Sequence, residues 1–447
     1  MAANREDFEA MPKAACPMSV GEVDLFAPGA QEHWYDSYKL LQAEEPVLRL
    51  PGQGYEPGSD AFVLTKYEDI RKVVRDPDLF PSRTGPGASG TSKIHDEIFE
   101  EEGFGEVVTA RDRLRPDIET HKLHRETLTE PWVGASGALQ HRDMITAHAN
   151  RLMDNWIDEG EVEFVTEFAA PLPQAVISTI LGFPLEDMPM TKKWEEAQVR
   201  RFVYGFGPKS QMEDPDEEDN AKALVAFNRY IQEQIDEKRR NPKDDMITFL
   251  TQVEYQGQPL ADGDIISVVS GMHIGGNETT QYALTSEAML LAQHPEIVEE
   301  LRADRSKVRF FVEEALRLYA PTQGLSGRMV ARDTEIRGVK IPAGSLLHLR
   351  WAAANRDPEL CEAPDEIRLD RKSPGKHLTF SIRPRGCPGA GLSRLEQNIA
   401  VDVMLDRIDE LKLATAKNDF KHQPGIMLGL YELHLEFTKA REAVPAG

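Results

Sequence analysis

The sequence contains few cysteines and no long hydrophobic run. Its three cysteines, Cys16, Cys361 and Cys387, are far apart and match no zinc, iron–sulfur or CxxC spacing. We therefore expect a reducing compartment and no structural disulfide. No stretch approaches the roughly eighteen apolar residues that a membrane-spanning helix needs, and Met1–Gly29 has no run suited to a signal peptide. These absences predict a cytoplasmic protein that does not bind a membrane.

Positive charge is also scarce. Lys and Arg together number 52 against 76 Asp and Glu, which gives a formal net charge of -24. Nucleic acids and anionic membranes are bound through a basic surface, so neither is an expected partner. The 447 residues, of which 40% are hydrophobic, are enough to form a globular protein that encloses a cofactor.

What the sequence does contain is helical apolar periodicity through its middle part. The expected helices are Met144–Ile157, Met190–Tyr204, Ala221–Arg239, Asp262–His294 and a last helix from Gly391 to about Arg407. The expected strands are Val47–Leu50, Ala61–Leu64 and Thr334–Ile341, and the acidic run Gln211–Asn220 is expected to be an exposed loop. We predict a mainly α fold with a minor β region, with a flexible N-terminal segment (1–20) and a single domain (21–440).

The helix expected over Asp262–His294 is interrupted by unfavourable residues. At ~1.5 Å per residue it spans about 50 Å, enough to cross the whole domain. In its middle lies Gly275-Gly-Asn-Glu-Thr-Thr280. Each interior glycine costs ~1 kcal/mol relative to alanine, and threonine hydroxyls compete for backbone carbonyls. This pattern is explained either by close helix packing or by a bare surface that a flat ligand and a small molecule can approach.

One cysteine lies where its sulfur can act chemically. Cys387 directly precedes the helix that starts near Gly391. A lone cysteine is usually a small buried hydrophobe. However, unpaired amides and the positive dipole end of the helix, together with Arg383 and Arg385, favour the thiolate. A thiolate in such a place can be an axial ligand of haem iron.

The segment Phe380-Ser-Ile-Arg-Pro-Arg-Gly-Cys387-Pro-Gly389 resembles the cysteine loop of the cytochrome P-450 family. That loop runs Phe, Gly, any, Gly, any, His or Arg, any, Cys, any, Gly. The matching positions are Phe380, Arg385, Cys387 and Gly389, while Ser381 and Arg383 stand where glycines are usual. The resemblance extends from about Phe26 to Leu435. It implies the cytochrome P-450 fold with a long central helix over haem b, and Cys387 as the iron ligand.

Two further motifs appear in the order that this resemblance implies. Glu314 and Arg317 share one helix face. By spacing alone they would be a surface ion pair, but the resemblance implies a buried pair joined by Arg371 that supports the cysteine loop. The glycines of Gly275–Thr280 correspond to a groove for dioxygen. Glu278 and Thr279 correspond to a catalytic acid–alcohol pair, in which the hydroxyl holds a proton-donating water and the carboxylate links it to solvent.

The remaining site residues are also implied by family position. The haem propionates need cationic or histidine partners. The implied haem contacts are His121, Arg125, Arg328, His377, Arg385, Gly275 and Phe380. The implied substrate contacts are Met272, Ile274, Gly275, Gly324, Leu325, Ser326, Met427 and Leu428, with Phe99, Phe104 and Phe202–Phe206 nearby. A surface charge or plain core packing is the simpler interpretation of each one alone. Together they form a mostly apolar pocket that suits a ligand held by shape.

The resemblance implies a monooxygenase that hydroxylates a small apolar compound with O2 and electrons from NAD(P)H. A terpenoid, a norisoprenoid or a small aromatic compound is expected, and a steroid or a fatty acid is a further candidate. The chain has no room for a reductase domain and no iron–sulfur spacing. We therefore expect a separate iron–sulfur ferredoxin and flavin reductase, and a monomeric enzyme. The range 371–395 has six Lys or Arg and no acid, so it is a candidate docking surface for an acidic ferredoxin.

Three other functions remain open on the sequence. One is a haem-thiolate peroxygenase driven by hydrogen peroxide, although such relatives typically lack the acid–alcohol pair that is present at Glu278 and Thr279. The second is a haem sensor or carrier that does not turn over, and the third is a helical protein without haem. Consumption of NADH and oxygen with substrate and redox partners separates a monooxygenase from the sensor. The spectrum of the reduced carbonyl form reports a thiolate-bound haem.

Overall fold

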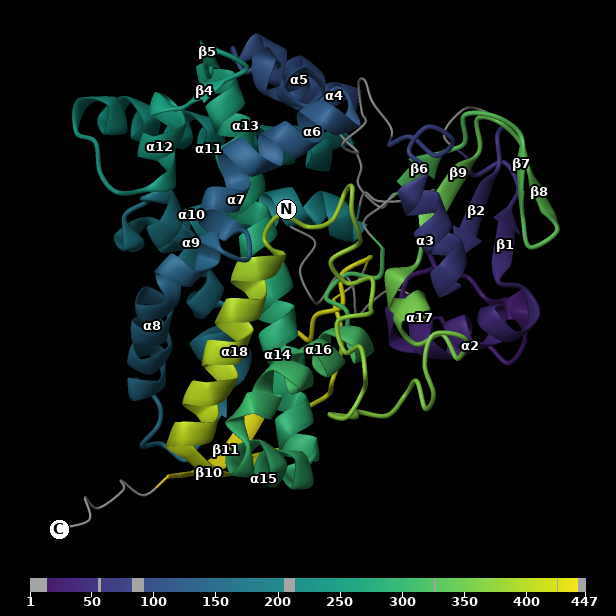
Figure 1. Ribbon diagram of the computed structural model, residues 1–447, viewed down its shortest axis with the longest axis vertical. Helices are drawn as coiled ribbons and strands as arrows, with labels where there is room; N and C mark the ends of the chain where they lie inside the picture. The colour runs from purple at the N-terminus through teal and green to yellow at the C-terminus, as the bar shows by residue number, and fades with distance from the viewer. Residues whose placement is uncertain are drawn as a thin grey trace.

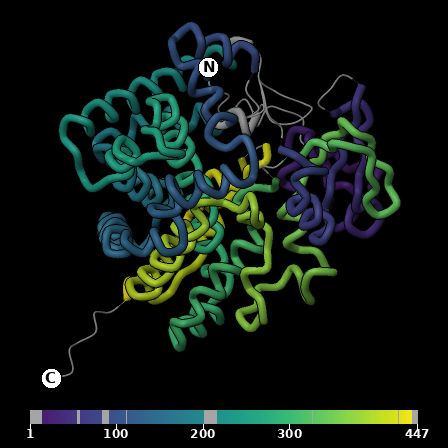
Figure 2. The backbone as a smooth tube through the Cα atoms, turned by 45° about the horizontal axis from the view of Figure 1, so that its top comes forward, coloured from purple at the N-terminus to yellow at the C-terminus, as the bar shows by residue number. Residues whose placement is uncertain are grey.

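The computed structural model describes residues 14–54, 58–82, 92–204, 214–324, 327–423 and 425–440. A large helical body and a smaller body containing the main sheet lie side by side (Figure 1). Figure 2, turned by 45°, keeps the purple and green sheet region on the same side of the helices. Within these described ranges, no helix is both long and apolar enough to cross a membrane.

The helical body is built from the middle of the chain and from the last helix. Its helices are α4 (Lys93–Glu101), α5 (Gly105–Leu114), α6 (Ile118–His124), α7 (Glu130–Val133), α8 (Arg142–Asp154), α9 (Pro171–Leu181), α10 (Met188–Tyr204), α11 (Asp214–Arg240), α12 (Met246–Gln252), α13 (Asp262–Gly276), α14 (Glu278–Gln293), α15 (Pro295–Ala303), α16 (Val308–Leu318) and α18 (Ala390–Arg407). The sheet body is accompanied by α2 (Trp34–Glu44), α3 (Tyr67–Arg75) and α17 (Trp351–Asn355). The mainly helical fold expected from the periodicity is confirmed.

The main sheet has the strand order β1-β2-β9-β6. Its strands are β1 (Val47–Leu50), β2 (Ala61–Leu64), β9 (Leu346–Leu349) and β6 (Gly327–Met329). β2 and β9 are parallel, whereas the outer pairs are antiparallel. β2 is buried on both faces: Phe62 packs in the cluster that contains Ile70 of α3, and Val63 packs in the cluster that contains Tyr38 of α2.

The other strands form small sheets at the edges of the molecule. A three-stranded sheet contains β10 (Ile408–Leu413), β11 (His434–Lys439) and β3 (Glu161–Glu163), and two hairpins pair β4 (Glu254–Tyr255) with β5 (Gln258–Pro259) and β7 (Thr334–Ile336) with β8 (Val339–Ile341). The short strands expected over Thr334–Ile341 are confirmed as a hairpin. Arg337 and Gly338 both have positive φ, 48° and 81°, which forms the two-residue turn of a hairpin.

Several strands and helices have bounds close to the predicted ones, but two predictions about helices are wrong. Strands β1 and β2 have the predicted bounds, and α18 begins one residue before the predicted Gly391. The acidic run is not all loop, because α11 already begins at Asp214. Acidic residues suit the positive end of a helix dipole, and Pro215 fits the first turn. Residues 211–213 lie outside the described part.

The expected long helix is also wrong as one element, because it is broken at Asn277 into α13 and α14. Asn277 has φ -101° and ψ -83°, outside the helical region. The amide of Glu278 donates to the side chain of Glu195 on α10, at 3.2 Å. A side chain that enters the helical hydrogen-bond ladder is a known cause of such a break.

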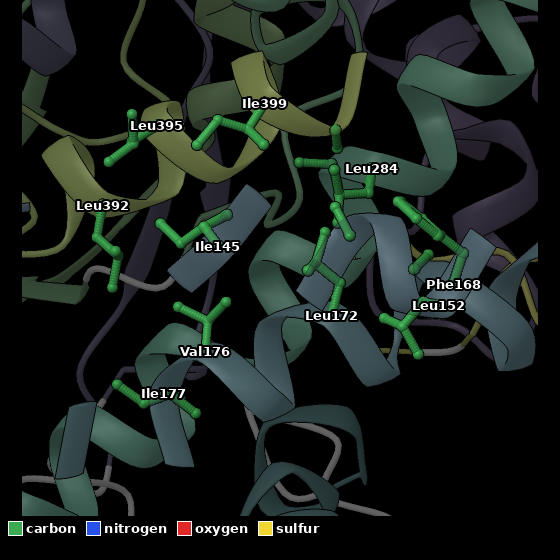
Figure 3. Close-up of a cluster of buried hydrophobic side chains, with 14 of the residues drawn as sticks. Ile145, Leu152, Phe168, Leu172, Val176, Ile177, Leu284, Leu392, Leu395 and Ile399 are labelled. Carbon is green, nitrogen blue, oxygen red and sulfur yellow. The ribbon is translucent and has the colours of Figure 1, made fainter. Parts of the chain in front are cut away.

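An aliphatic core fixes α14 against α18. Figure 3 shows side chains of α8, α9, α14 and α18 meeting in this core, and they include Ile145, Leu172, Val176, Leu284, Leu392, Leu395 and Ile399. Between the same two helices, the Thr280 hydroxyl of α14 lies 3.3 Å from the Ser393 hydroxyl of α18. Because α18 begins three residues after Cys387, this packing also places the Gly275–Thr280 segment relative to the cysteine loop.

Candidate active site

The cysteine loop is held by backbone hydrogen bonds. The Cys387 amide donates to the Phe380 carbonyl at 2.8 Å, which closes the loop. The Arg125 guanidinium donates to the carbonyls of Gly386 and Cys387. The amides of Gly389 and Ala390 donate to the sulfur. The sulfur itself is exposed, so this turn presents it to a ligand.

Two opposing influences act on the pKa of the Cys387 thiol. Burial by surrounding protein atoms raises the pKa of the Cys387 thiol above its ordinary 9.0. The amides and the charges of Arg125 and Arg394 lower this pKa but do not outweigh burial.

Ser381 replaces the first usual glycine of the loop at a cost. Its φ is 55°, in the left-handed region that glycine adopts without penalty. A side chain there is strained by ~1–2 kcal/mol. Arg383, at the second usual glycine, has no positive φ and its side chain is exposed. The departure from the family pattern therefore strains the loop at one of its two positions.

The structure brings Glu314, Arg317 and Arg371 together behind this loop. Arg317 donates to both oxygens of Glu314, at 2.8 and 2.9 Å, and the Arg371 Nε atom donates to Oε2 at 2.8 Å. Glu314 is fully buried and Arg317 is 2% exposed. Arg317 also donates to the carbonyl oxygens of Asn355, Pro364 and Glu366. This cluster therefore ties α16 to the chain that leads into the cysteine loop.

His377, a predicted haem contact, belongs to a second cluster on α16. Its Nε2 atom lies 2.9 Å from Glu313, whose carboxylate also accepts from Arg394 of α18. Burial raises the pKa of Glu313, but these two partners outweigh it and lower that pKa to about 2. The Arg394 guanidinium lies 4.4 Å from the ring centre of Phe380. In this geometry His377 supports the loop rather than facing a ligand.

The two glycines at the end of α13, Gly275 and Gly276, have different surroundings. A Cβ atom added at Gly275 would meet no described atom within 4 Å, whereas one at Gly276 would lie 3.2 Å from Ile177. Gly275 therefore fits the interpretation as a bare surface, and Gly276 fits the interpretation as close helix packing. The Thr279 hydroxyl donates to the Gly275 carbonyl at 2.9 Å, beside the open surface. Thr280 is buried and faces Ser393 instead.

Glu278 lies in a buried polar cluster. Its Oε2 atom accepts from the Tyr282 hydroxyl at 2.7 Å, and its Oε1 atom is 3.5 Å from Lys192 Nζ. Glu195 lies 3.0 Å from the same Lys192 nitrogen. Neither Lys192 nor Glu195 was predicted from the sequence, because they come from α10, more than eighty residues earlier. The i, i+4 spacing of Glu278 and Tyr282 was the available signal for that contact.

The other predicted haem contacts come from separate elements. His121 is buried on α6, Arg328 is buried on β6, and Arg385 is partly exposed in the cysteine loop. Arg125 holds the cysteine loop and also pairs with Glu130 at 3.0 Å. The exposed sulfur, the open surface at Gly275 and these cations fit a flat anionic cofactor with an axial sulfur ligand.

The predicted substrate residues divide into two groups. Met427 bridges to Thr322, and the Leu428 amide donates to the Pro321 carbonyl at 2.8 Å, so these two segments lie together. A Cβ at Gly324 would be 2.0 Å from the Leu349 carbonyl oxygen, which gives this glycine a packing role. Met272, Ile274 and Phe104 are partly buried on the helical side, and Phe99 is buried. Leu325, Ser326, residues 205–206 and the side chains of 202–204 lie outside the described part of the chain.

Comparison with known proteins agrees with this geometry. The family model described as Cytochrome P-450 matches residues 58–437. "Polyketide biosynthesis cytochrome P-450 PksS" of Bacillus subtilis (strain 168) is 27% identical over 420 residues, 93% of this chain and 99% of the relative. "Biotin biosynthesis cytochrome P-450" of the same organism is 30% identical over 386 residues, 85% of this chain and 90% of the relative.

A solved structure shows the same fold. The complex of P-450BioI with hexadec-9Z-enoic acid ligated acyl carrier protein has a TM-score of 0.78 and 27% identity, and the match covers 91% of this chain and 99% of that chain. The match of the family model to most of the chain, the near full-length relatives and the exposed sulfur ahead of α18 lead to one conclusion. The chain belongs to the cytochrome P-450 family and is a haem b-dependent monooxygenase.

Proposed function

We propose that this enzyme hydroxylates a small apolar compound, a terpenoid, a norisoprenoid or an aromatic, as a cytoplasmic monomer in which residues 21–440 form one domain. NAD(P)H supplies the electrons through a flavin reductase and an iron–sulfur ferredoxin. The observation that carries the proposal is the Thr279 hydroxyl beside the open surface at Gly275. These residues lie at the junction of α13 and α14. Helix α14 packs against α18, and α18 begins directly after the cysteine loop.

We assign the haem to the space between the cysteine loop and α13. Cys387 would bind the iron, and His121, Arg328 and Arg385 would bind the propionates. When bound, the haem supplies the iron chemistry that activates dioxygen. Arg125 has a mixed role, because its guanidinium also holds the loop carbonyls of Gly386 and Cys387.

We assign proton delivery to Thr279 and Glu278. The Thr279 Oγ1 atom donates its hydrogen to Gly275, and its oxygen can still accept a hydrogen bond from a water. The Glu278 carboxylate, beside Lys192 and Tyr282, would pass a proton toward that water. Buried Thr280 faces Ser393 and has no such role.

The substrate proposal rests on an apolar lining. Met427, Leu428 and Phe99 are buried, and Met272 and Ile274 are partly buried. Such a lining recognises shape and apolar surface. The two relatives' names refer to polyketide and biotin biosynthesis, so the family itself does not select one substrate class. A screen for substrate-induced spin-state shifts across terpenoids, aromatics, steroids and fatty acids tests the class directly.

The ferredoxin proposal can be narrowed to three cations of the range 371–395. Arg371 and Arg394 are bound to Glu314 and Glu313 inside the protein. Lys372, Lys376 and Arg383 have exposed side chains in the cysteine-loop region. These three would attract an acidic ferredoxin by charge, with an effect that salt weakens.

The test compares Thr279→Ala with Thr280→Ala. Thr279→Ala should bind haem and substrate normally and still consume NADH, because only the positioned proton donor is lost. Loss of such a donor typically costs ~10²–10⁴-fold in the affected step. Less product and more hydrogen peroxide per NADH are therefore expected. The measurement is product, NADH and hydrogen peroxide in one sample.

Thr280→Ala is the matched control and should stay coupled. If Thr280→Ala uncouples and Thr279→Ala does not, the acid–alcohol pair is displaced by one residue. If neither variant changes the ratio, the proposed proton route is wrong and peroxide-driven turnover becomes the better function.

A further inference from the structure

Two buried carboxyl groups share one lysine at the junction of α13 and α14. Lys192 Nζ lies 3.0 Å from Glu195 Oε2 and 3.5 Å from Glu278 Oε1. Glu195 is fully buried and Glu278 is 6% exposed. With every group charged, the cluster would carry one uncompensated negative charge away from water. Such a charge is expensive, so a proton is the simplest way to remove it.

The electrostatic balance agrees with a held proton. Burial, together with the nearby Glu278, raises the pKa of Glu195 to about 8, although Lys192 lowers it. For Lys192, burial lowers the pKa but the two carboxylates raise it, so the lysine is charged at neutral pH. Both carboxyls contact the same Lys192 nitrogen, at 3.0 and 3.5 Å, so one proton can be shared by the two groups.

Glu195 also shapes the helix junction. Its Oε1 atom accepts from the Glu278 amide at 3.2 Å, and its Oε2 atom accepts from the Asn277 side-chain amide. In an uninterrupted helix the Glu278 amide would bond to the carbonyl four residues earlier. Glu195 therefore replaces a backbone acceptor and breaks the helix beside the carbonyl that binds Thr279.

Other polar groups around the cluster define its open side. The Lys192 side chain is 24% exposed, whereas that of Glu195 is not exposed. On the inner side the Tyr282 hydroxyl lies between Glu278 and Gln423, at 2.7 and 2.8 Å. His273 is buried, and burial followed by the charge of Lys192 lowers its pKa to about 3, so it is neutral. Glu196 is exposed and acts on Lys192 from outside.

We propose that Glu195 is a positioning residue that shares one proton with Glu278 beside Lys192. The shared proton is then available for transfer into the active site. The inference rests on the proposed role of Glu278. Solvent reaches the pair at Lys192, and the proton leaves it at Glu278 toward Thr279. When a proton leaves the pair, the charged Lys192 holds the resulting second carboxylate until another proton enters from solvent.

The first test uses infrared spectra of the haem-loaded enzyme. A protonated buried carboxyl has a carbonyl stretch separate from that of a carboxylate. Glu287 and Glu396 are buried carboxyls whose pKa is also raised, so they contribute bands of their own. We expect one further band in the wild type, seen in the difference between the wild-type and Glu195→Gln spectra, and its loss as the pH rises through about 8. Glu195→Gln and Glu278→Gln should both lack the band at neutral pH, because the one remaining carboxylate then pairs with Lys192. Glu196→Gln, which removes the neighbouring exposed carboxylate, should keep it.

The second test is the ratio of product to NADH in the same variants. Glu195→Gln should lose coupling, while Glu196→Gln should keep it. Substrate binding should be unchanged in both. The coupling of Glu195→Gln should also lose the pH dependence that the wild type shows near pH 8.

The outcomes separate this inference from the proposed function. A band that persists in Glu278→Gln would place the proton on Glu195 alone and overturn the sharing. Loss of the band with full coupling in Glu195→Gln, while Thr279→Ala uncouples, would reject the proton supply but leave the proposed function standing. Full coupling in Thr279→Ala as well would overturn the proposed function itself. The wild-type titration and Glu278→Gln give a result even if Glu195→Gln folds poorly.

Discussion

Two buried clusters in this protein contain the same kinds of group in opposite proportions. Behind the cysteine loop, one carboxylate, Glu314, meets two guanidinium groups, those of Arg317 and Arg371. At the helix junction, two carboxyls, Glu195 and Glu278, meet one ammonium group, that of Lys192. The first cluster has more cations than carboxyl groups, and the second has fewer cations than carboxyl groups.

This proportion decides what each cluster can do. Burial raises the pKa of Glu314, but its two arginines outweigh burial and lower that pKa below its ordinary value. The pKa of Glu195 is raised to about 8 instead. Arginine also grips a carboxylate with a rigid fork, whereas lysine is a flexible point charge. One cluster is therefore a fixed tie between segments, and the other can gain and lose a proton near neutral pH.

The largest expected effect comes from breaking the fixed tie. Glu314→Ala leaves the buried guanidinium of Arg317 and the partly buried one of Arg371 without their carboxylate, at a cost of ~3–5 kcal/mol. We expect little folded, haem-loaded protein, measured as haem content and as the reduced carbonyl spectrum of a thiolate-bound haem. Glu299→Gln, on an exposed side chain of α15, is the control and should express normally. Normal haem content in Glu314→Ala would make this cluster dispensable.

Removal of one cation from each cluster sharpens the comparison. Arg371→Met takes away hydrogen bonds to a charged group and should cost ~1.5–3 kcal/mol of unfolding free energy. Lys192→Met should cost more, ~3–5 kcal/mol, because it leaves two buried carboxyl groups with no cation. Denaturant unfolding of both variants measures the two losses. Equal losses would contradict the distinction between the clusters.

The two clusters should also respond to pH in opposite directions. Glu314 has a lowered pKa when folded, so its contribution is present above its ordinary pKa and lost as pH falls through the folded value. Glu195 binds a proton more tightly when folded, so its contribution is full at low pH and declines as pH rises toward about 8. One proton corresponds to at most ~1.4 kcal/mol per pH unit. The difference in unfolding between wild type and Glu195→Gln from pH 5 to 9 measures this slope, and equal slopes would count against the raised pKa.

The smallest effect concerns strain in the cysteine loop. Ser381→Gly should relieve the left-handed backbone at φ 55°. The gain of ~1–2 kcal/mol is partly offset by the greater freedom of glycine in the unfolded chain, ~0.5–1 kcal/mol. We expect a net stabilisation of at most about 1.5 kcal/mol, seen as a small rise in Tm with the spectrum unchanged. A fall in Tm would show that the Ser381 side chain makes a contact worth more than the strain.

Local patterns in the sequence predicted several elements well. Val47–Leu50 and Ala61–Leu64 were expected to be short strands, and both have the predicted bounds. The periodicity after Cys387 predicted α18 to within one residue. Glu314 and Arg317 lie on one helix face three residues apart, and the structure brings them together with Arg371. These features depend on neighbours in the chain or on a short motif.

Contacts between distant segments account for most of what sequence reasoning missed. The break at Asn277 depends on Glu195, a residue of another helix whose own surroundings in the sequence look like an ordinary charged surface. The surroundings of Cys387 show the same limit of local patterns. A helix terminus can be recognised locally, but the burial that raises the thiol pKa comes from the whole fold.

The sequence by itself determined which chemical groups this protein has available for its chemistry. They are a cysteine ahead of a helix, an acid and an alcohol in a glycine-rich helix, and a basic run in an acidic chain. The tertiary structure alone decided their charge states and surroundings. Burial and the number of opposite charges within a few ångströms set protonation in the folded protein. Those quantities make Glu314 a fixed anion and Glu195 a holder of a proton.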